Sequence, residues 1–242
     1  MEINKIYKED CLETMARMPD DFADLSFTSP PYNMNLRVLK GKYCSRQILK
    51  EEFSTKYSEF SDNLPIDEFY NLHKKILGEL IRVSKIVFYN ISIVTGSKRA
   101  FFKLMGDYSN NIKEFIIWDK GHAQPAMHNN VLNRQHELIL VLEKENKSIN
   151  RMFDKCNFTR GSLNDIWLVK KSRKSVDGHK ATFPEELVSK VLVNFTNKND
   201  LVYDCFSGTG TTAYVCKQLD RNYIGSEISQ KYYDVSNKRL SV

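Results

Sequence analysis

The amino-acid sequence predicts an α/β fold: a doubly wound, mostly parallel sheet with helices on both faces. Segments of helical periodicity alternate with apolar, β-branched runs, which is the pattern of strands joined by crossover helices. The run Ile86–Val94 is nearly continuously apolar or aromatic, as in a strand buried on both faces. A Gly-rich stretch at residues 207–211 separates a predicted strand from a predicted helix.

The composition is that of an ordinary globular chain. The 242 residues are 41% hydrophobic and 27% charged, which excludes a wholly disordered protein. The 36 basic against 30 acidic residues, a net charge of +6, favour a polyanionic partner only weakly. Five scattered cysteines without a C-x-x-C pair predict neither a disulfide scaffold nor a thiolate zinc site.

The N-terminus and the hydropathy pattern predict where the chain resides. No apolar run approaches the ~18 residues of a membrane span. The N-terminal residues are charged and lack the apolar stretch of a signal peptide. We therefore expect a reduced, soluble, cytoplasmic protein with no metal site and no membrane partner.

The first elements in chain order are a short strand, a helix around Cys11–Met18 and a strand in the apolar run Ala23–Thr28. Residues 34–64 are polar and irregular, and a loop of this length is usually functional or mobile. From Ile66 the pattern turns helical, because apolar residues recur three and four positions apart. These residues are Phe69, Leu72, Ile76, Leu80 and Val83.

The later elements continue the alternation. A helix near Lys98–Tyr108 precedes two strands, at Lys113–Trp118 and His136–Glu143. A helix over residues 184–196 begins at Pro184 and carries acids in its first turn, where they suit the helix dipole. The chain then predicts a strand at Leu201–Phe206, a helix at Thr212–Leu219, a strand at Asn222–Glu227 and a closing helix.

Residues 144–180 carry most of the charge asymmetry. They hold ten Lys or Arg against four Asp or Glu, an excess equal to the net charge of the whole chain. Either this segment is a solvated loop, or it contacts phosphates, because basic side chains that neutralise phosphates supply sequence-independent affinity. The candidate phosphate ligands are Arg151, Arg160, Lys170, Lys171, Arg173 and Lys174.

A first constellation lies near the C-terminus, in Asp204-x-Phe206-x-Gly208-x-Gly210. The glycines allow a ligand to approach the backbone closely, and the helix that follows offers free N–H groups. Glu227 ends the next strand, where an acid accepts ribose hydroxyls. Only 15 residues follow Glu227, so earlier chain must complete the sheet. A sheet completed by earlier chain is unusual for a dinucleotide-dependent oxidoreductase. Such an oxidoreductase is nevertheless one interpretation of the Gly-rich motif, and a tight turn that binds no ligand is another.

A second constellation, Ser29-Pro30-Pro31-Tyr32, directly follows an apolar strand. The prolines fix the backbone and donate no hydrogen bond, so the turn presents acceptors: the Ser29 hydroxyl and the Pro30 carbonyl. Tyr32 adds a flat aromatic face. Such a site suits a planar ring that carries an exocyclic amine. The alternatives are a plain strand terminator and a half-buried core aromatic.

In their order along the chain, with Ser29–Tyr32 before Phe206–Gly210, the two motifs resemble those of the β-class, or circularly permuted, DNA amino-methyltransferases. These enzymes use S-adenosyl-L-methionine and release S-adenosyl-L-homocysteine. The resemblance implies a Rossmann-like methyltransferase sheet with a small target-recognition insertion. Residues 1–143 and 179–242 would form one catalytic domain. Residues 144–178 would be the target-recognition insertion, and residues 34–64 a mobile DNA-contact loop.

The resemblance also implies roles for individual residues. The catalytic set is Ser29, Pro30, Pro31 and Tyr32. In the cofactor-binding set, Asp10 would meet the adenine, and His179, Lys180 and Pro184 would lie toward the methionine end. The other members of the set are Cys11, Asp204, Phe206, Gly208, Gly210, Thr211, Thr212 and Glu227. Asp165-Ile-Trp167 is similar to a D-x-W element of the family. Glu9, Lys180 and Cys205 depart from the Gly, Pro and Pro that are common at these positions.

The implied activity is methylation of an exocyclic amine on a flipped base of double-stranded DNA. Family members with Ser at the first motif position favour cytosine N4, with adenine N6 as the alternative. No Pro-Cys dipeptide is present, which excludes the cysteine nucleophile needed for methylation at cytosine carbon 5. The segment lengths are compatible with a homodimer, and a cognate restriction endonuclease is a possible partner. A non-catalytic DNA-binding module is the most distant alternative.

Overall fold

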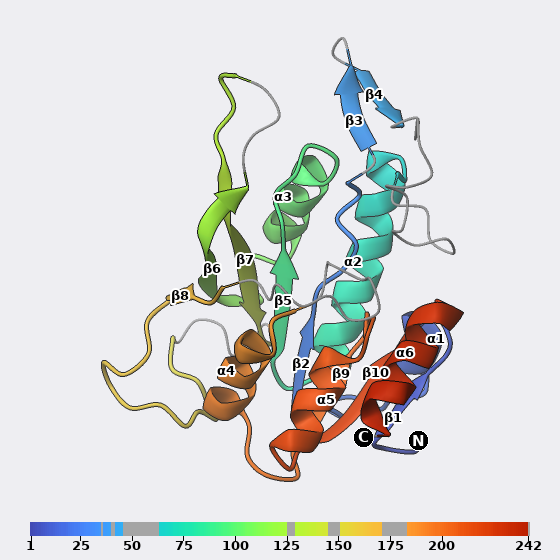
Figure 1. The fold of residues 1–242 in the computed structure, drawn as a ribbon, viewed down its shortest axis with the longest axis vertical. Helices are drawn as coiled ribbons and strands as arrows, with labels where there is room; N and C mark the ends of the chain where they lie inside the picture. The colour runs from blue at the N-terminus through green and yellow to red at the C-terminus, as the bar shows by residue number, and fades with distance from the viewer. Residues whose placement is uncertain are drawn as a thin grey trace.

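In a computed structural model of the chain, the described residues are 1–34, 36–39, 42–45, 63–124, 129–144, 151–170 and 183–241. The main sheet has eight strands in the order β1-β10-β9-β2-β5-β7-β6-β8 (Figure 1). The strands are β1 (Lys5–Tyr7), β2 (Leu25–Thr28), β5 (Val87–Ile91), β6 (Ile112–Gln124), β7 (Arg134–Leu142), β8 (Ile166–Leu168), β9 (Leu201–Asp204) and β10 (Asn222–Ser226).

The predicted mostly parallel sheet is confirmed. Five neighbouring strand pairs are parallel, from β1–β10 through β2–β5 and at the β6–β8 edge. Only β7 runs against its neighbours β5 and β6 within the described sheet. The reason is that β6 and β7 form one long hairpin, so the chain returns directly instead of through a crossover helix.

Helices cover both faces of the sheet, as a doubly wound fold requires. They are α1 (Cys11–Ala16), α2 (Ile66–Val83), α3 (Lys98–Asp107), α4 (Glu185–Phe195), α5 (Thr211–Gln218) and α6 (Gln230–Leu240). In β5, Val87, Tyr89 and Ile91 join the core under α1, α2 and α3. Phe88 points the other way and joins the core under α4, α5 and α6. All five residues of β5 are buried, which confirms the predicted strand that is buried on both faces.

Two expectations about irregular segments are wrong. Within residues 34–64, Leu36–Leu39 (β3) and Lys42–Ser45 (β4) pair as a separate antiparallel hairpin. Residues 144–178, which the sequence predicts as a basic insertion without a strand of the sheet, contain β8, which pairs with β6 in the main sheet. Only Trp167 of β8 is buried, between the exposed Ile166 and Leu168. Three residues are too few for a two-residue periodicity to stand out in the sequence.

None of the described helices has the length and apolar character needed to cross a lipid bilayer.

The longest helix, α2, buries a histidine at its centre. His73 is fully buried, and its Nδ1 lies 2.6 Å from the Tyr89 hydroxyl. Among the described residues, its Nε2 has no hydrogen-bond partner. Burial lowers the pKa of His73 from 6.5 to about 3. The imidazole is therefore neutral in the folded protein near neutral pH, because charging it would place an unpaired cation in the core.

This burial predicts a loss of stability in acid. Below about pH 6.5 the unfolded chain protonates His73, whereas the folded protein does not until its pKa of about 3. The unfolded state then binds more protons, so the free energy of unfolding falls by about 1.4 kcal/mol for each pH unit of acidification. Urea denaturation of the wild-type protein and His73→Asn at pH 6 and pH 4.5 should show the steeper decline in the wild type. A comparison at pH 8, where both are uncharged at this position, isolates the packing cost. Equal slopes would contradict the prediction.

Candidate active site

The two sequence constellations follow adjacent strands. Ser29–Tyr32 follows β2, the Phe206–Gly210 turn follows β9, and these strands pair in parallel. From β2 the chain crosses through α2 to β5 on one side, and from β9 it crosses through α5 to β10 on the other. The strand order therefore reverses between β9 and β2 (Figure 1). In open α/β sheets, ligands bind at the carboxyl ends of the strands at this switch point.

A buried carboxylate joins the ends of these strands. Asp204 Oδ1 accepts hydrogen bonds from Thr28 Oγ1 at 2.7 Å and from the Phe206 amide at 3.1 Å. Its Oδ2 accepts one from Thr212 Oγ1 at 2.7 Å, at the start of α5. Burial raises the pKa of Asp204, and these donors oppose that shift. Asp204 therefore connects β2, the Gly-rich turn and α5. Direct contact between Asp204 and a cofactor stays a prediction from the sequence.

Gly208 and Gly210 occupy different environments in the turn. Gly210 caps α5 with φ of 73°, and a Cβ added there would lie 2.8 Å from Ser236 Cβ of α6. A side chain would therefore both strain the backbone and collide with the neighbouring helix. Gly208 has φ of 51°, and among the described residues the nearest atom to an added Cβ is the Phe206 carbonyl oxygen at 3.9 Å. A Cβ at Gly208 would therefore make only an ordinary van der Waals contact with the described residues, and the cost of a side chain there comes from the positive φ.

Glu227 is held rigidly beside this turn. Its Oε2 accepts the Gly208 amide and its Oε1 accepts the Ser229 amide, both at 2.8 Å. Its own amide donates to the Tyr7 carbonyl of β1 at 3.0 Å. Glu227 as a whole residue is 8% exposed. The acid predicted from the sequence therefore lies against the Gly-rich turn.

The proline turn is anchored by a residue that sequence analysis did not select. Asn33 has φ of 56° and is buried. Its Nδ2 donates to the Leu64 carbonyl at 2.8 Å and to the Gly96 carbonyl at 3.1 Å. Asn is one of the few residues that tolerates this backbone region, so it ends the turn and ties it to the chain before α2 and α3.

A buried polar cluster lies behind Ser29 and Tyr32. The Tyr32 hydroxyl lies 2.5 Å from Ser29 Oγ and donates to Glu137 Oε2 at 3.1 Å. Asn90 Nδ2 donates to the Tyr32 oxygen at 2.6 Å and to Glu137 at 2.8 Å. Lys120 donates to Glu137 Oε1 at 3.3 Å. Sequence analysis missed Asn90, Glu137 and Lys120, although a polar residue inside or beside an apolar strand is itself a signal of a site.

Aromatic rings connect the two turns on the α2 side of the sheet. Tyr32 meets the edge of Phe101 at a centroid distance of 6.5 Å. Phe101 meets His73 at 5.7 Å, and His73 meets Phe206 at 6.4 Å. Tyr32 and Phe206 are both partly buried against the same core. The early and late motifs therefore lie on the same side of one core, at the ends of paired strands.

The other predicted cofactor residues are distributed around the same edge. Asp10 follows β1 and caps α1, its Oδ1 accepting the Leu12 amide at 2.8 Å, and Cys11 is buried behind it. Thr211 accepts from Arg239 at 3.1 Å. Pro184 is the residue before α4. His179 and Lys180 lie outside the described residues.

The predicted phosphate ligands divide between two edges of the sheet. Arg151 pairs with Glu114 at 2.5 Å near the amino end of β6, the edge opposite Ser29. Its position there argues against a role beside the two turns. Lys170 follows β8 and so lies at the carboxyl edge. Arg160 is exposed. Lys171, Arg173 and Lys174 lie outside the described residues.

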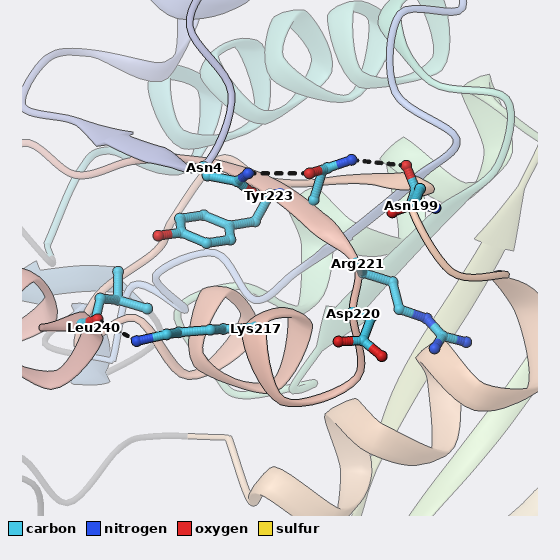
Figure 2. A pocket seen from close by; sticks show the side chains of 8 residues that line it. Asn4, Asn199, Lys217, Asp220, Arg221, Tyr223 and Leu240 are labelled. Carbon is cyan, nitrogen blue, oxygen red and sulfur yellow. Dashed lines mark hydrogen bonds between the residues drawn. The ribbon is translucent and has the colours of Figure 1, made fainter. Parts of the chain in front are cut away.

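A separate surface pocket of about 390 Å³ lies at the amino ends of β9 and β10 (Figure 2). Its polar walls bond to one another: Asn4 to Asn222 at 3.0 Å, and Asn222 to the Asn199 carbonyl at 2.8 Å. This pocket is at the wrong edge of a parallel sheet for the chemistry of the two turns. Among the described residues, no group of three or more His, Cys, Asp and Glu side chains is placed to hold a metal ion.

Comparison with known proteins shows the family to which the chain belongs. Residues 23–238 match the model of the N6/N4 methyltransferase family, described as DNA methylase. The chain belongs to this family. The resemblance inferred from the motifs is therefore confirmed at the level of the family, and the match does not favour the oxidoreductase alternative.

Two curated relatives of this DNA methylase align along nearly its whole length. It is 30% identical to the type II methyltransferase M.HinfI of Haemophilus influenzae, over 98% of this chain and 68% of that protein. It is 26% identical to the type II methyltransferase M.BglII of Bacillus subtilis, over 99% of this chain and 69% of that protein.

Solved structures confirm the predicted fold of the methylase. The PvuII DNA methyltransferase, described as cytosine-N4-specific, superposes with a TM-score of 0.71 at 17% identity, over 97% of this chain and 85% of that one. The complex of M1.HpyAVI with SAM superposes with a TM-score of 0.63 at 21% identity, over 98% of both chains. At these identities the likeness shows the α/β methyltransferase fold alone.

Loss of the hydrogen bond between Thr28 and Asp204, which joins β2 to β9, should lower the stability of the protein. Thr28→Val keeps the shape of the side chain but leaves buried Asp204 without one of its donors. We expect the free energy of unfolding in urea to fall by about 1–3 kcal/mol. Thr159→Val, at an exposed threonine, is the control and should change stability by less than about 0.5 kcal/mol. Similar small effects in both variants would show that the bond contributes little.

Proposed function

We propose that this DNA methylase is a β-class, S-adenosyl-L-methionine-dependent enzyme that methylates an exocyclic amine of a base in double-stranded DNA, with cytosine N4 as the favoured target. The proposal rests on one observation. The turn that presents amine acceptors and the turn that suits an adenosine cofactor lie on paired strands, joined by the Thr28–Asp204 hydrogen bond of 2.7 Å. Neither turn alone would bring a methyl donor to an acceptor.

The residues of the Gly-rich turn fit the cofactor. Among the described residues, no atom lies closer than 3.9 Å to a Cβ added at Gly208, and Glu227 is held beside this glycine by two backbone amides. Glu227 would accept the ribose hydroxyls. The partly exposed ring of Phe206 would face the sulfonium, because an aromatic face attracts a cation. When bound, the cofactor supplies an electrophilic methyl group.

Ser29 and Pro30 would activate the target amine. The amine of a nucleobase is a poor nucleophile because its lone pair is delocalised into the ring. Hydrogen bonds from its two N–H groups to the Ser29 hydroxyl and the Pro30 carbonyl favour a pyramidal nitrogen. They also stabilise the positive charge that develops as the nitrogen–carbon bond forms and the carbon–sulfur bond breaks. Serine is too weak a base to remove a proton first, so the proton leaves after transfer, to solvent.

Tyr32 would hold the base in this position. The target amine is inaccessible inside a duplex, so the nucleotide must leave the stack, at a cost of a few kcal/mol. A base stacked on an aromatic side chain recovers about 1–3 kcal/mol. The Tyr32 ring is fixed at its hydroxyl by Asn90 and Glu137, and along its edge by Phe101. A fixed ring loses little freedom when a base binds.

Cytosine N4 is favoured over adenine N6 by Ser29 at the first position of the motif. The fold of the cytosine-N4-specific PvuII enzyme is compatible with this choice. Adenine N6 is the alternative, because serine also occurs in adenine enzymes of the family. Lys170 and the basic residues after it would contact phosphates. A homodimer and a cognate restriction endonuclease remain proposals from the sequence.

The reaction product decides between these alternatives. DNA without methyl groups, prepared by whole-genome amplification, should gain 4-methylcytosine when it is treated with the protein and the cofactor, as measured by mass spectrometry of the released nucleosides. Ser29→Ala should bind the cofactor as the wild type does but lose about 10²- to 10³-fold in kcat, the usual cost of one lost electrostatic contact to the transition state. A 6-methyladenine product would overturn the cytosine assignment. No methylated nucleoside at all would overturn the proposed activity.

Glu227 should control cofactor affinity. Glu227→Gln keeps the size of the side chain but replaces a charged acceptor, so we expect cofactor binding to weaken by about 1–3 kcal/mol, which is roughly 5- to 150-fold in Kd. Isothermal titration measures this change. Glu186→Gln, at an exposed position on α4, is the matched control and should bind normally. An unchanged Kd in Glu227→Gln would remove this residue from the cofactor site.

A further inference from the structure

Three buried polar side chains lie near Ser29, and the proposed mechanism uses two of them, Asn90 and Glu137, only to fix the Tyr32 ring. Asn90 is fully buried, and Glu137 and Lys120 are each 7% exposed. They come from β5, β7 and β6, so the structure assembles them from three separate strands. A buried ion pair such as Lys120–Glu137 is weak evidence for stability, because desolvation offsets most of the attraction. Their position behind the proposed amine-binding turn suggests a different purpose.

Hydrogen-bond directions within this cluster follow from chemistry. The Glu137 carboxylate pairs with Lys120 at 3.3 Å and can only accept. The Tyr32 hydroxyl donates its single hydrogen to Glu137 Oε2 at 3.1 Å. The distance of 2.5 Å between Ser29 Oγ and the Tyr32 oxygen by itself leaves the donor open. With the tyrosine hydrogen on Glu137, the tyrosine oxygen accepts in this contact and Ser29 donates.

Asn90 is oriented by the same carboxylate. Its amide nitrogen donates to Glu137 at 2.8 Å and to the Tyr32 oxygen at 2.6 Å. The opposite orientation would turn the amide oxygen toward a carboxylate, which is repulsive. Asn90 also approaches Ser29 Oγ at 3.3 Å, a longer contact. Glu137 thus sets the hydrogen-bond direction of Tyr32 and Asn90, the two side chains hydrogen-bonded to Ser29 within the described part of the chain.

We propose that Glu137 is a positioning residue for methyl transfer, which acts through Tyr32 to direct the Ser29 hydroxyl hydrogen away from the target amine. This inference rests on the proposed role of Ser29. A serine hydroxyl can either accept an N–H of the amine or donate its hydrogen to the amine lone pair. The second arrangement blocks the reaction, because that lone pair must form the new nitrogen–carbon bond. The Ser29–Tyr32–Glu137 chain selects the first arrangement.

The same hairpin supplies a matched control pair. Lys113 and Glu143 are also joined by an ion pair, at 2.7 Å, with side chains only 1% and 5% exposed. This pair lies at the other end of the β6–β7 hairpin, away from Ser29. A purely structural function of buried ion pairs in this hairpin would make the two pairs equivalent.

The test compares Glu137→Gln with Glu143→Gln. The amide that Glu137→Gln introduces can donate a hydrogen to the Tyr32 oxygen, so the chain to Ser29 loses its fixed direction. With tritiated cofactor and whole-genome-amplified DNA, we expect kcat to fall by about 10- to 100-fold in Glu137→Gln. Cofactor Kd and the KM for DNA should change less than kcat, because Glu137 contacts neither the base nor the cofactor directly in the proposed site. Glu143→Gln should keep the wild-type kcat even if its melting temperature falls.

A double-mutant cycle distinguishes a loss of the Ser29 hydroxyl orientation from a general disruption of the local structure. Tyr32→Phe retains the ring but removes the middle hydroxyl, so it should also lower kcat. The double variant Tyr32→Phe/Glu137→Gln should be no slower than the slower single variant, because both changes break one chain. If Glu137→Gln does not fold, Tyr32→Phe carries the test, and a wild-type kcat in it overturns the proposal.

The outcomes separate this inference from the proposed function. An inactive wild-type protein, or a fully active Ser29→Ala, would overturn the role of Ser29 itself. An active wild type with an inactive Ser29→Ala, but a wild-type kcat in Glu137→Gln, would overturn only the role of Glu137. Equal losses of kcat in Glu137→Gln and Glu143→Gln, or multiplicative losses in the double variant, would assign the cluster a structural role.

Discussion

The hydrogen bond between Thr28 Oγ1 and Asp204 Oδ1 is the constraint on which the site depends. It joins residues 176 positions apart in the chain, at the ends of two paired strands. A buried carboxylate is costly unless donors surround it. Asp204 receives hydrogen bonds from β2, from the Gly-rich turn and from the start of α5. One acid therefore sets the position of the amine-binding turn relative to the cofactor turn.

The buried polar groups explain why the carboxyl edge of the sheet carries the chemistry. Most core positions between the strands and helices are apolar. Asn33, Asn90, Glu137 and Asp204 depart from this rule, and each serves one of the two turns. Parallel strands bring these turns to one edge, and the reversal of strand order between β9 and β2 leaves them side by side. These four buried polar residues thus orient the two turns, whereas the buried Lys113–Glu143 pair lies at the opposite edge of the sheet.

Much of the fold and part of the site could be predicted, because their signals are local. Helical spacing identified α2, and a continuous apolar run identified β5. The short strand β8 and the β3–β4 hairpin were missed because they are too short to show a period. Arg151 was selected by charge alone, and only its partner Glu114 revealed that it lies at the opposite edge.

The sequence by itself determined the kinds of residue in the two turns, their order along the chain and the α/β class, since each of these is written in neighbouring residues. Only the tertiary structure decided that Tyr32 meets Asn90 and Glu137, and that Glu227 lies against Gly208. These contacts join residues from 19 to 105 positions apart. They form because strand pairing and the burial of apolar faces bring distant strands together, and no short stretch of sequence encodes that pairing.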